Sequence, residues 1–500
     1  MIPRGFSVLA IVALVGCKGA DEQGVDIVEE AGPVPTRVAD SGIHPPATAV
    51  QWLAAGGGAL PQDNQLSIEA DLALVRDTLG PDNGILLYAG GEGTRAVQVA
   101  DSSRRGDPLR ALLGDLFDPR AGRNASYRRT TLSPAGAATL RSLTERLKST
   151  MSTGETPLTL YLTGHGEPSS QGQAVRHVTW GGQGFTPAEL ASLFDRGTSK
   201  RPVQLVMTSC YSGAFANVAF RLGDRGNFAR PAVIRCGLFA TTEDRPSSGC
   251  DPNPDRRQHE SYTRHLMHAL MGQDHMGAPL APAEVDFDGD GQVTWLEAHA
   301  RARIALTGFD VPTSTSELWL RVNAPLHGEG EVHWPEETAV VEALAARLGI
   351  SPSGAGLTAE VERQAQAIAT LETRLTPATE AELDAFDAVV AVVLNRWPWL
   401  NDPWHPDFEP GLTRERAAIE AWFREDPRYQ DYWAAFRVVD QLAGELDAAS
   451  IKLAPYLRLQ RALEFQLLAG WMKADGGPRW DYYLALRRCE AGQPITSSKP

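Results

Sequence analysis

Two reactive side chains follow two short apolar segments in the first half of this 500-residue chain. His165 comes after the segment 157–163, and Cys210 comes after the segment 202–208. A cysteine becomes a strong nucleophile when it loses its proton, and a neighbouring imidazole favours the resulting thiolate. The pair therefore predicts nucleophilic catalysis, with Cys210 as the nucleophile and His165 as its general base.

The elements around this pair must bring the two side chains together. Both apolar segments are short, rich in β-forming residues and followed by glycine, which is typical of buried strands. Between them, Thr186, Pro187 and Glu189 have the spacing of a helix start with a capping box. The order strand, helix, strand predicts a right-handed parallel crossover. Neighbouring strands lie about 5 Å apart, so His165 and Cys210 would share the sheet edge where such folds place their sites.

The glycine beside the histidine has a predicted role of its own. Gly166 carries no side chain, so a substrate carbonyl could approach the backbone there. The N–H groups of Gly166 and Cys210 would then stabilise the developing oxyanion. An isolated cysteine after an apolar strand is more often a buried hydrophobe. Two glycine-flanked reactive residues in one strand–helix–strand unit favour the catalytic interpretation.

The residues around His165 and Cys210 resemble a known family. Thr163-Gly-His-Gly166 and Thr208-Ser-Cys-Tyr-Ser-Gly213 are similar to the histidine and cysteine blocks of the caspase-fold cysteine peptidases. Bacterial relatives of legumain are the most similar group, and metacaspases come next. The resemblance covers about residues 47–306. It implies a caspase-like three-layer α/β/α fold with a mostly parallel sheet, with His165 as base and Cys210 as nucleophile.

The substrate pocket follows the family less closely. Metacaspases and several relatives carry an acidic residue two positions before the cysteine, where this chain has Thr208. Acidic pocket chemistry is therefore not carried over from that position. Glu243 and Asp244 follow a predicted strand at the place where the family builds its substrate pocket. The resemblance thus implies a pocket that favours cleavage after a basic residue.

The remaining pattern predicts two domains. Strands at 48–55, 85–89 and 232–242 alternate with helices at 67–79, 133–150 and 262–271, which indicates a doubly wound α/β domain over 48–334. The stretch 101–131 is polar and is predicted as a loop with a short helix at 109–117. Residues 335–500 show helical periodicity and predict an all-α domain, with seven tryptophans in its core. Its predicted helices are 339–348, 358–375, 380–395, 414–425, 429–443 and 449–474.

An acidic motif over 286–297 predicts one structural calcium ion. Its acidic and glycine residues match the spacing of an EF-hand loop, in which carboxylates at alternating positions converge on the cation. The segment before the motif has no helical period, so we expect a single loop that is followed by a helix. The predicted ligands are Asp286, Asp288, Asp290, Gln292 through its backbone, Thr294 through water, and Glu297.

The first 47 residues predict export and a lipid anchor. Arg4 precedes a short apolar run that ends in Leu14-Val-Gly-Cys17 and is too short to span a bilayer. This ending resembles a bacterial lipoprotein signal, which implies that residues 1–17 are the signal and that Cys17 is lipidated. Residues 18–47 are polar and rich in proline and predict a flexible tether. We expect the protein in the bacterial cell envelope, anchored to a membrane and facing the periplasm or the exterior.

Charge and cysteine content restrict the partners and the disulfides. The net charge of −15 argues against nucleic-acid binding. An exported protein can hold a disulfide, and Cys236, Cys250 and Cys489 remain once Cys17 and Cys210 have been assigned. Cys236 with Cys250 is one candidate pair, and Cys489 leaves the pairing open.

These patterns together predict an exported, lipid-anchored cysteine endopeptidase that cleaves proteins or peptides through a thioester acyl-enzyme. Two alternatives use the same residues. A non-catalytic caspase-like scaffold would bind protein partners, and a transamidase would resolve the acyl-enzyme with an amine instead of water.

Overall fold

The structure is a computed structural model of the whole chain. It describes residues 51–100, 106–117, 122–170, 173–197, 200–226, 230–249, 260–351 and 353–492. The predicted signal, Cys17, the tether and Cys250 lie outside the described residues. Within these ranges, every helix is too short or too polar to cross a membrane.

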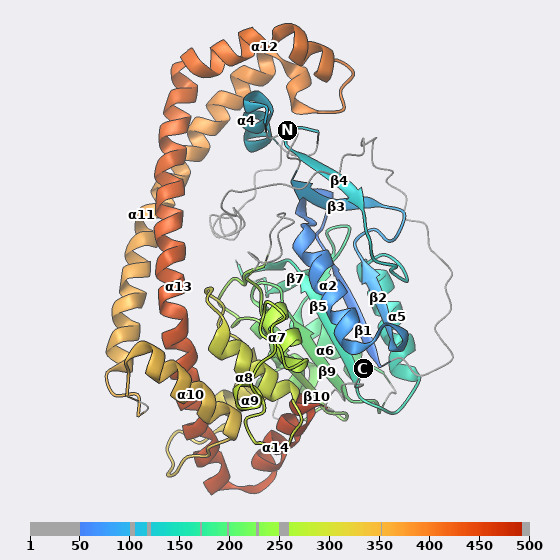
Figure 1. Cartoon of the computed structure of the whole chain (residues 1–500), viewed down its shortest axis with the longest axis vertical. Coiled ribbons are helices and arrows are strands. Elements are labelled where there is room, and N and C mark those ends of the chain that lie inside the picture. The colour runs from blue at the N-terminus through green and yellow to red at the C-terminus, as the bar shows by residue number, and fades with distance from the viewer. Residues whose placement is uncertain are drawn as a thin grey trace.

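A six-stranded sheet forms the centre of the first part of the chain (Figure 1). The strand order is β11-β10-β9-β5-β1-β2, and all neighbours are parallel except β10 and β11. The predicted mostly parallel sheet is therefore confirmed. Its strands are β1 (Trp52–Gly57), β2 (Gly84–Tyr88), β5 (Leu158–Gly164), β9 (Val203–Met207), β10 (Arg235–Phe239) and β11 (Thr313–Ser314).

Helices cover both faces of this sheet and make three layers. Side chains of a strand alternate between faces, so Trp52 and Ala54 of β1 join one core and Leu53 and Ala55 join the other. The first face is covered by α2 (Leu66–Leu79), α7 (Tyr262–Leu270) and α8 (Trp295–Ala305). The second is covered by α5 (Leu140–Ser152), α6 (Pro187–Asp195) and the 3₁₀ helix η3 (Ser212–Ala219).

Two smaller sheets lie outside the elements that the sequence predicted. The predicted short helix is present as α4 (Pro108–Leu116), but the rest of 101–131 is not all loop. Strand β3 (Arg95–Ala100) precedes α4 in the chain and β4 (Ala125–Arg129) follows it, and the two strands pair as an antiparallel ribbon. The loop prediction was wrong there because β4 contributes only two buried apolar side chains, Ala125 and Tyr127. The second sheet contains β6 (Gly166–Glu167), β7 (Arg176–Val178) and β8 (Gly184–Phe185).

The C-terminal part is helical, as predicted, but its helices are longer than expected. Each of two predicted helix pairs is one continuous helix that runs through a proline, Pro377 in one and Pro455 in the other. A proline inside a helix costs about 3 kcal/mol, so packing must outweigh that cost. Leu375 meets Val439 and Leu442 in such a core. The helices are α9 (Thr315–Asn323), α10 (Pro335–Leu348), α11 (Leu357–Arg396), α12 (Phe408–Glu425), α13 (Pro427–Asp475) and α14 (Gly477–Ala491).

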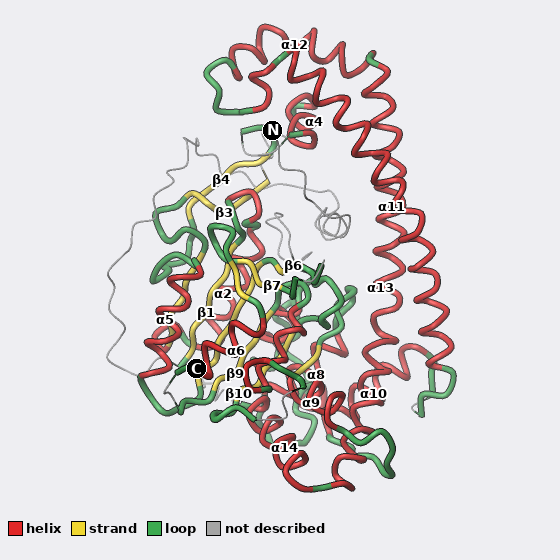
Figure 2. The backbone as a smooth tube through the Cα atoms, turned by 180° about the vertical axis from the view of Figure 1, so that it is seen from behind, coloured by secondary structure: helices red, strands yellow, loops and turns green. Residues whose placement is uncertain are grey.

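Helices α11 and α13 lie side by side and form an arm along one side of the sheet (Figure 2). At 1.5 Å per residue, their 40 and 49 residues correspond to about 60 and 74 Å. The arm turns back at α12, and there its tip contacts α4 (Figure 1). Arg123 is fully buried at this contact and donates hydrogen bonds to the carbonyls of Leu400 and Asn401. The arm is therefore fixed at its tip to α4 and to Arg123, which lies just before β4.

The tryptophans of the C-terminal part are only partly the core that the sequence predicted. Trp397, Trp399 and Trp422 are buried and pack with α4 at the tip of the arm. Trp404 and Trp433 are 41% exposed. The core prediction is thus confirmed for the first three and wrong for the last two.

The last helix returns to the central sheet. Tyr482, Tyr483 and Leu486 of α14 pack in one core with Phe220 and Cys236. A disulfide joins Cys236 of β10 to Cys489 of α14. It closes a loop of more than two hundred residues, and a bridge of that span strongly restricts the unfolded chain. The candidate pair of Cys236 with Cys250 is wrong, and the disulfide joins α14 to the central sheet.

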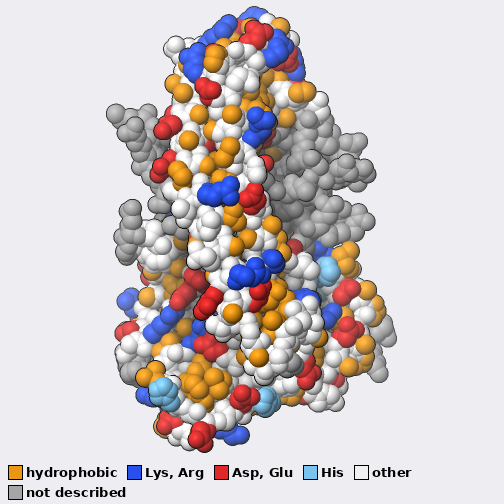
Figure 3. Space-filling view, turned by 90° about the vertical axis from the view of Figure 1, so that its left-hand side faces the viewer, with side chains coloured by type: hydrophobic (Ala, Val, Ile, Leu, Met, Phe, Trp, Pro, Cys, Tyr) orange, Lys and Arg blue, Asp and Glu red, His pale blue; other side chains and the backbone are white. Residues whose placement is uncertain are grey.

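The outer side of the arm presents a mixed surface. Figure 3 shows basic and acidic side chains interspersed with apolar ones along the arm. The large apolar side chains that are exposed on α11 and α13 include Leu383, Trp433 and Val438. Charges of both signs along one surface keep the local field small.

Candidate active site

Strands β5 and β9 are direct neighbours, as the crossover predicted. Their last paired residues are Leu162 and Met207, and the N–H of Thr208 donates to the carbonyl of Leu162 at 3.0 Å. His165 and Cys210 each come three residues after this pair. The register therefore brings both reactive residues to the same edge of the sheet.

Gly166 lies directly against the backbone of the cysteine. A Cβ atom at position 166 would be 2.0 Å from the carbonyl oxygen of Cys210, which is a severe clash. Glycine is therefore required next to His165 by the close approach of the two chain segments. The predicted oxyanion pair, Gly166 and Cys210, thus consists of neighbours in space.

A sharp turn presents Cys210 at the end of β9. Tyr211 has a φ of 59°, a left-handed conformation that is uncommon for a residue with a side chain. Its N–H donates to the carbonyl of Arg245 at 2.9 Å, which holds the turn. The 3₁₀ helix η3 begins at Ser212, so the turn leads directly into a helix. Strained conformations of this kind are concentrated at functional sites.

His165 is oriented by the segment that follows β1. Its Nε2 atom lies 2.6 Å from the carbonyl oxygen of Asp63 and 3.2 Å from Oε1 of Gln65. A carbonyl oxygen only accepts, so Nε2 carries the proton and donates it to Asp63. In the neutral ring, Nδ1 is then the nitrogen that can accept a proton.

The sulfur of Cys210 contacts the loop after β10. The N–H of Ser247 points to Sγ at 3.2 Å, and the carbonyl of Ser247 lies 3.6 Å from it. Cys210 is half-buried, and among the described cysteines it is the one outside the disulfide. The described part of the chain thus contains a single thiol, and it lies at the predicted nucleophile position.

A second histidine at this edge was missed by sequence reasoning. His177 of β7 is fully buried, pairs with Gly166 across the small sheet and has Nδ1 3.3 Å from Oγ of Ser209. Burial lowers the pKa of His177 to about 3, and the charge of His165 acts in the same direction. His177 therefore stays neutral beside the reactive pair. The polar context of 170–177 carried no strand signal that would have placed it there.

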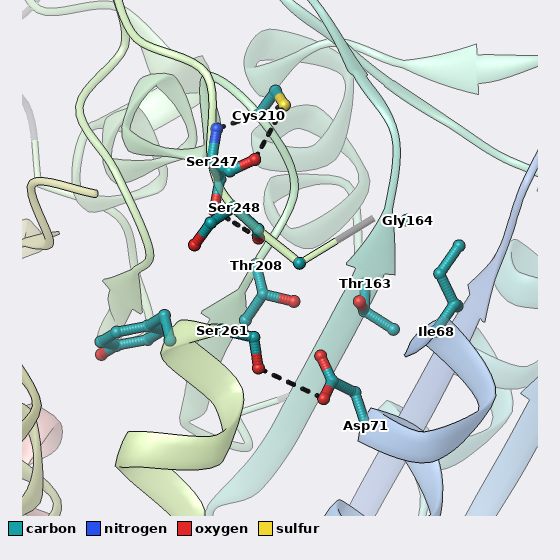
Figure 4. Close-up of a pocket in the computed structure, with 11 residues that line it drawn as sticks. Ile68, Asp71, Thr163, Gly164, Thr208, Cys210, Ser247, Ser248 and Ser261 are labelled. Atoms are coloured by element: carbon teal, nitrogen blue, oxygen red, sulfur yellow. Dashed lines mark hydrogen bonds between the residues drawn. The ribbon is translucent and has the colours of Figure 1, made fainter. Parts of the chain in front are cut away.

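A narrow pocket opens next to Cys210 between α2, α7 and the ends of β5 and β9 (Figure 4). It has room for about one water molecule. Asp71 of α2 lies at one end and accepts a hydrogen bond from Ser261 at 3.4 Å. The walls carry hydroxyl groups of Thr163, Thr208 and Ser247 among others. The pocket therefore offers one carboxylate and several hydroxyls near the nucleophile.

The two acidic residues predicted for the pocket lie elsewhere. Glu243 is exposed and forms an ion pair with Arg225. Asp244 is exposed and accepts a hydrogen bond from Thr242 at 2.6 Å. Neither lines the pocket beside Cys210, and Asp71 is the carboxylate that does. Asp71 lies within an amphipathic helix pattern, which gave no sign that its side chain turns toward the strand ends.

The acidic loop has only part of the arrangement that a calcium site needs. Carboxylate oxygens of Asp286, Asp288 and Asp290 lie within 4.8 Å of one another. Glu297 instead accepts hydrogen bonds from the N–H groups of Phe287 and Thr294. Hard oxygen ligands at this spacing suit calcium. Each carboxylate oxygen of Glu297 accepts a second hydrogen bond as well, from the N–H of Asp288 and from the hydroxyl of Thr294, so Glu297 would have to turn to bind the ion. The loop is followed by α8, as predicted, and is preceded by a short 3₁₀ helix, η6 (Pro282–Glu284), rather than by an α-helix.

Comparison with known proteins gave no relatives: no family model and no curated protein matches this chain.

Acid should destabilise the protein through His177. The unfolded histidine takes a proton near pH 6.5, whereas the folded one stays neutral down to about pH 3. The unfolded state therefore binds more protons in this window, and stability falls as the pH is lowered. For one such group the free energy of unfolding falls by up to about 1.4 kcal/mol per pH unit. Urea unfolding at pH 7, 6 and 5 measures it.

The His177→Gln variant should reduce this slope because glutamine does not titrate. Replacement of the exposed His327 by glutamine is the matched control and should leave the slope as in the wild type. Equal slopes in the wild type and His177→Gln would contradict the assignment.

Proposed function

We propose that this chain is a cysteine endopeptidase of the caspase-like fold that cleaves protein or peptide substrates. The observation that supports this most is the register of β5 and β9, which brings His165 and Cys210 to one sheet edge with Gly166 against the cysteine backbone. The strained turn at Tyr211 presents the thiol at that edge. A thiol, a base and backbone N–H groups in one place are the parts that acyl transfer needs.

The proposed reaction uses these groups in order. Nδ1 of His165 accepts the proton of Cys210, and the thiolate attacks the carbonyl carbon of the substrate. N–H groups of Gly166 and Cys210 stabilise the negative oxygen of the tetrahedral intermediate. The amine leaves with the proton from His165, and a thioester remains on Cys210. Water, deprotonated by His165, then hydrolyses the thioester and restores the thiol.

The pocket beside Cys210 supports a preference for a basic residue at the cleavage site. Asp71 supplies a negative charge, and the surrounding hydroxyls accept hydrogen bonds from a cationic side chain. The pocket has room for about one water molecule, so it must widen before a long side chain can enter.

We also propose that the acidic loop holds one calcium ion with a structural role. Asp286, Asp288 and Asp290 would hold it, with the backbone of Gln292, water on Thr294 and a reoriented Glu297. The bound ion would neutralise the repulsion among these carboxylates. Phe287 of the loop packs in the same core as Val340 and Leu344 of α10, so the loop supports the base of the arm.

The proposed location is the bacterial cell envelope, with a lipid on Cys17 and residues 18–47 as the tether. The disulfide between Cys236 and Cys489 favours an oxidising compartment, because such bonds are rare in the cytosol.

Loss of the thiol should abolish turnover. Cys210→Ala is expected to lower kcat/KM by about a thousand-fold or more, since no other group can form the thioester. His165→Ala should lower it by about a hundred-fold or more. A peptide chosen from a positional library is the substrate, and release of its amine product is measured.

The controls separate chemistry from folding and from the alternative functions. Both variants should melt like the wild type, and His327→Ala should keep full activity. Peptidase activity that survives Cys210→Ala would exclude this nucleophile. A wild-type protein that cleaves no library member, with an ordinary thiol at Cys210, would favour a binding scaffold. Product formation that requires an added amine would favour a transamidase.

Calcium should stabilise the folded chain. A ligand that binds only the folded state raises stability by about 2.7 kcal/mol at a hundred times its Kd. The Tm is therefore expected to rise with calcium and to fall in chelator. Asp288→Ala should lose the response, whereas Asp481→Ala, a change in α14, should keep it. An identical Tm with calcium and with chelator would show that the loop is only a turn.

Lipidation of Cys17 should decide where the protein is found. The wild type is expected in the detergent phase after expression in a bacterial host, because two or more acyl chains anchor stably. Cys17→Ser should move to the aqueous phase. A Cys17→Ser variant that is processed and partitions like the wild type would contradict the anchor.

A further inference from the structure

The loop 245–249 contacts the sulfur of Cys210 through Ser247. The N–H of Ser247 is 3.2 Å from Sγ, closer than the carbonyl of the same residue at 3.6 Å (Figure 4). The carbonyl can accept only from the protonated thiol, whereas the N–H can donate to the thiolate. The position of this loop therefore determines whether its contact with the sulfur favours the thiol or the thiolate of Cys210.

A buried carboxylate fixes the position of this loop. Asp310 is fully buried, and its two oxygens accept from the backbone N–H of Ser248, at 2.9 Å, and from the hydroxyl of Ser248. Ser248 directly follows the residue that contacts the sulfur. On the other side of Ser247, the carbonyl of Arg245 accepts from the N–H of Tyr211. The loop is thus held at both ends, and Asp310 provides the charged end.

Asp310 is itself held by the base of the arm. Glu260 accepts from the N–H groups of Thr307 and Gly308, in the turn that leads to Asp310. Arg458 of α13 is buried and donates to the carbonyls of Arg303 and Leu306, at the end of α8. The charges that act on Asp310 include those of Arg245, Arg458 and Glu260, and Asp244 and Glu372 also act on Arg245 of the loop.

We propose that Asp310 is a positioning residue for the nucleophile: it holds the loop 245–249 so that the N–H of Ser247 stabilises the thiolate of Cys210. This inference rests on the proposed function, since it concerns how the same thiol is activated. A hydrogen bond to a charged group is stronger than one between neutral groups, so the thiolate gains more from the N–H than the thiol does. Asp310 acts through Ser247 and Ser248, and no hydrogen bond joins it to the sulfur itself among those described.

The test measures the pH profile of Cys210 alkylation in the full chain. Iodoacetamide labels the thiolate, and mass spectrometry of the peptide that contains Cys210 gives its rate at each pH. Asp310→Asn keeps the size of the side chain but replaces one acceptor oxygen with a donor. Its alkylation midpoint should rise by about one pH unit, because part of a charge-assisted hydrogen bond is lost. Ser248→Ala removes only the hydroxyl contact and should shift the midpoint in the same direction by less.

A matched control removes the charge of a different, partly buried carboxylate. Asp195 pairs with Arg235, which lies at the opposite edge of the sheet, in register with Val203. Asp195→Asn should therefore keep the wild-type midpoint, even if it lowers Tm.

Two outcomes are decisive. A wild-type midpoint in folded Asp310→Asn would overturn the positioning role, and if that variant does not fold, a wild-type midpoint in Ser248→Ala would do so. Alkylation needs no substrate, so the result is independent of peptidase activity. If Asp310→Asn shifts the alkylation midpoint but the wild type cleaves no peptide, the positioning role of Asp310 stands and the peptidase function is rejected.

Discussion

The parallel pairing of β5 and β9 is the constraint on which the rest of the site depends. Because Leu162 is paired with Met207, equal lengths of chain carry His165 and Cys210 past the edge of the sheet. A shift of one residue in this register would turn one of the two side chains to the other face. The close contact of Gly166 with the Cys210 carbonyl and the left-handed turn at Tyr211 follow from this pairing, since both occur where the strands end together.

The sequence predicted those parts of the fold in which local pattern and burial agree. The strands with apolar runs, the capped helix at Thr186 and the neighbouring positions of His165 and Cys210 are of this kind. The ribbon of β3 and β4 was missed because its strands have few apolar residues. The continuity of α11 past Pro377 was missed because it depends on packing against α13, which has no local signal. The partners of the nucleophile were hidden for the same reason. Asp71 and Asp310 are polar residues, and their burial depends on elements that are far from Cys210 in the sequence or lie in another layer of the fold.

Buried charges are concentrated where the arm meets the sheet layers. Arg303 pairs with Glu337 at 2.7 Å, and Arg461 pairs with Glu317 at 2.5 Å, with all four side chains largely buried. Such pairs contribute little net stability, because desolvation offsets their attraction, but breaking one of them leaves an uncompensated charge. They therefore specify how α8, α9, α10 and α13 fit together. Arg458 belongs to the same region, so the geometry near Asp310 depends on that fit.

The arm is attached to the body at two places, through this charged base and through the contact of its tip with α4. A helix pair that is held at both ends cannot rotate about a single hinge, so any displacement must bend the helices themselves. Bending costs least where a backbone hydrogen bond is already missing, which in α11 is at Pro377. The arm is therefore expected to act as a rigid support and not to open and close as a unit. A partner that displaces the tip of the arm would therefore change the angle of α13 slightly at the base, where this helix carries Arg458.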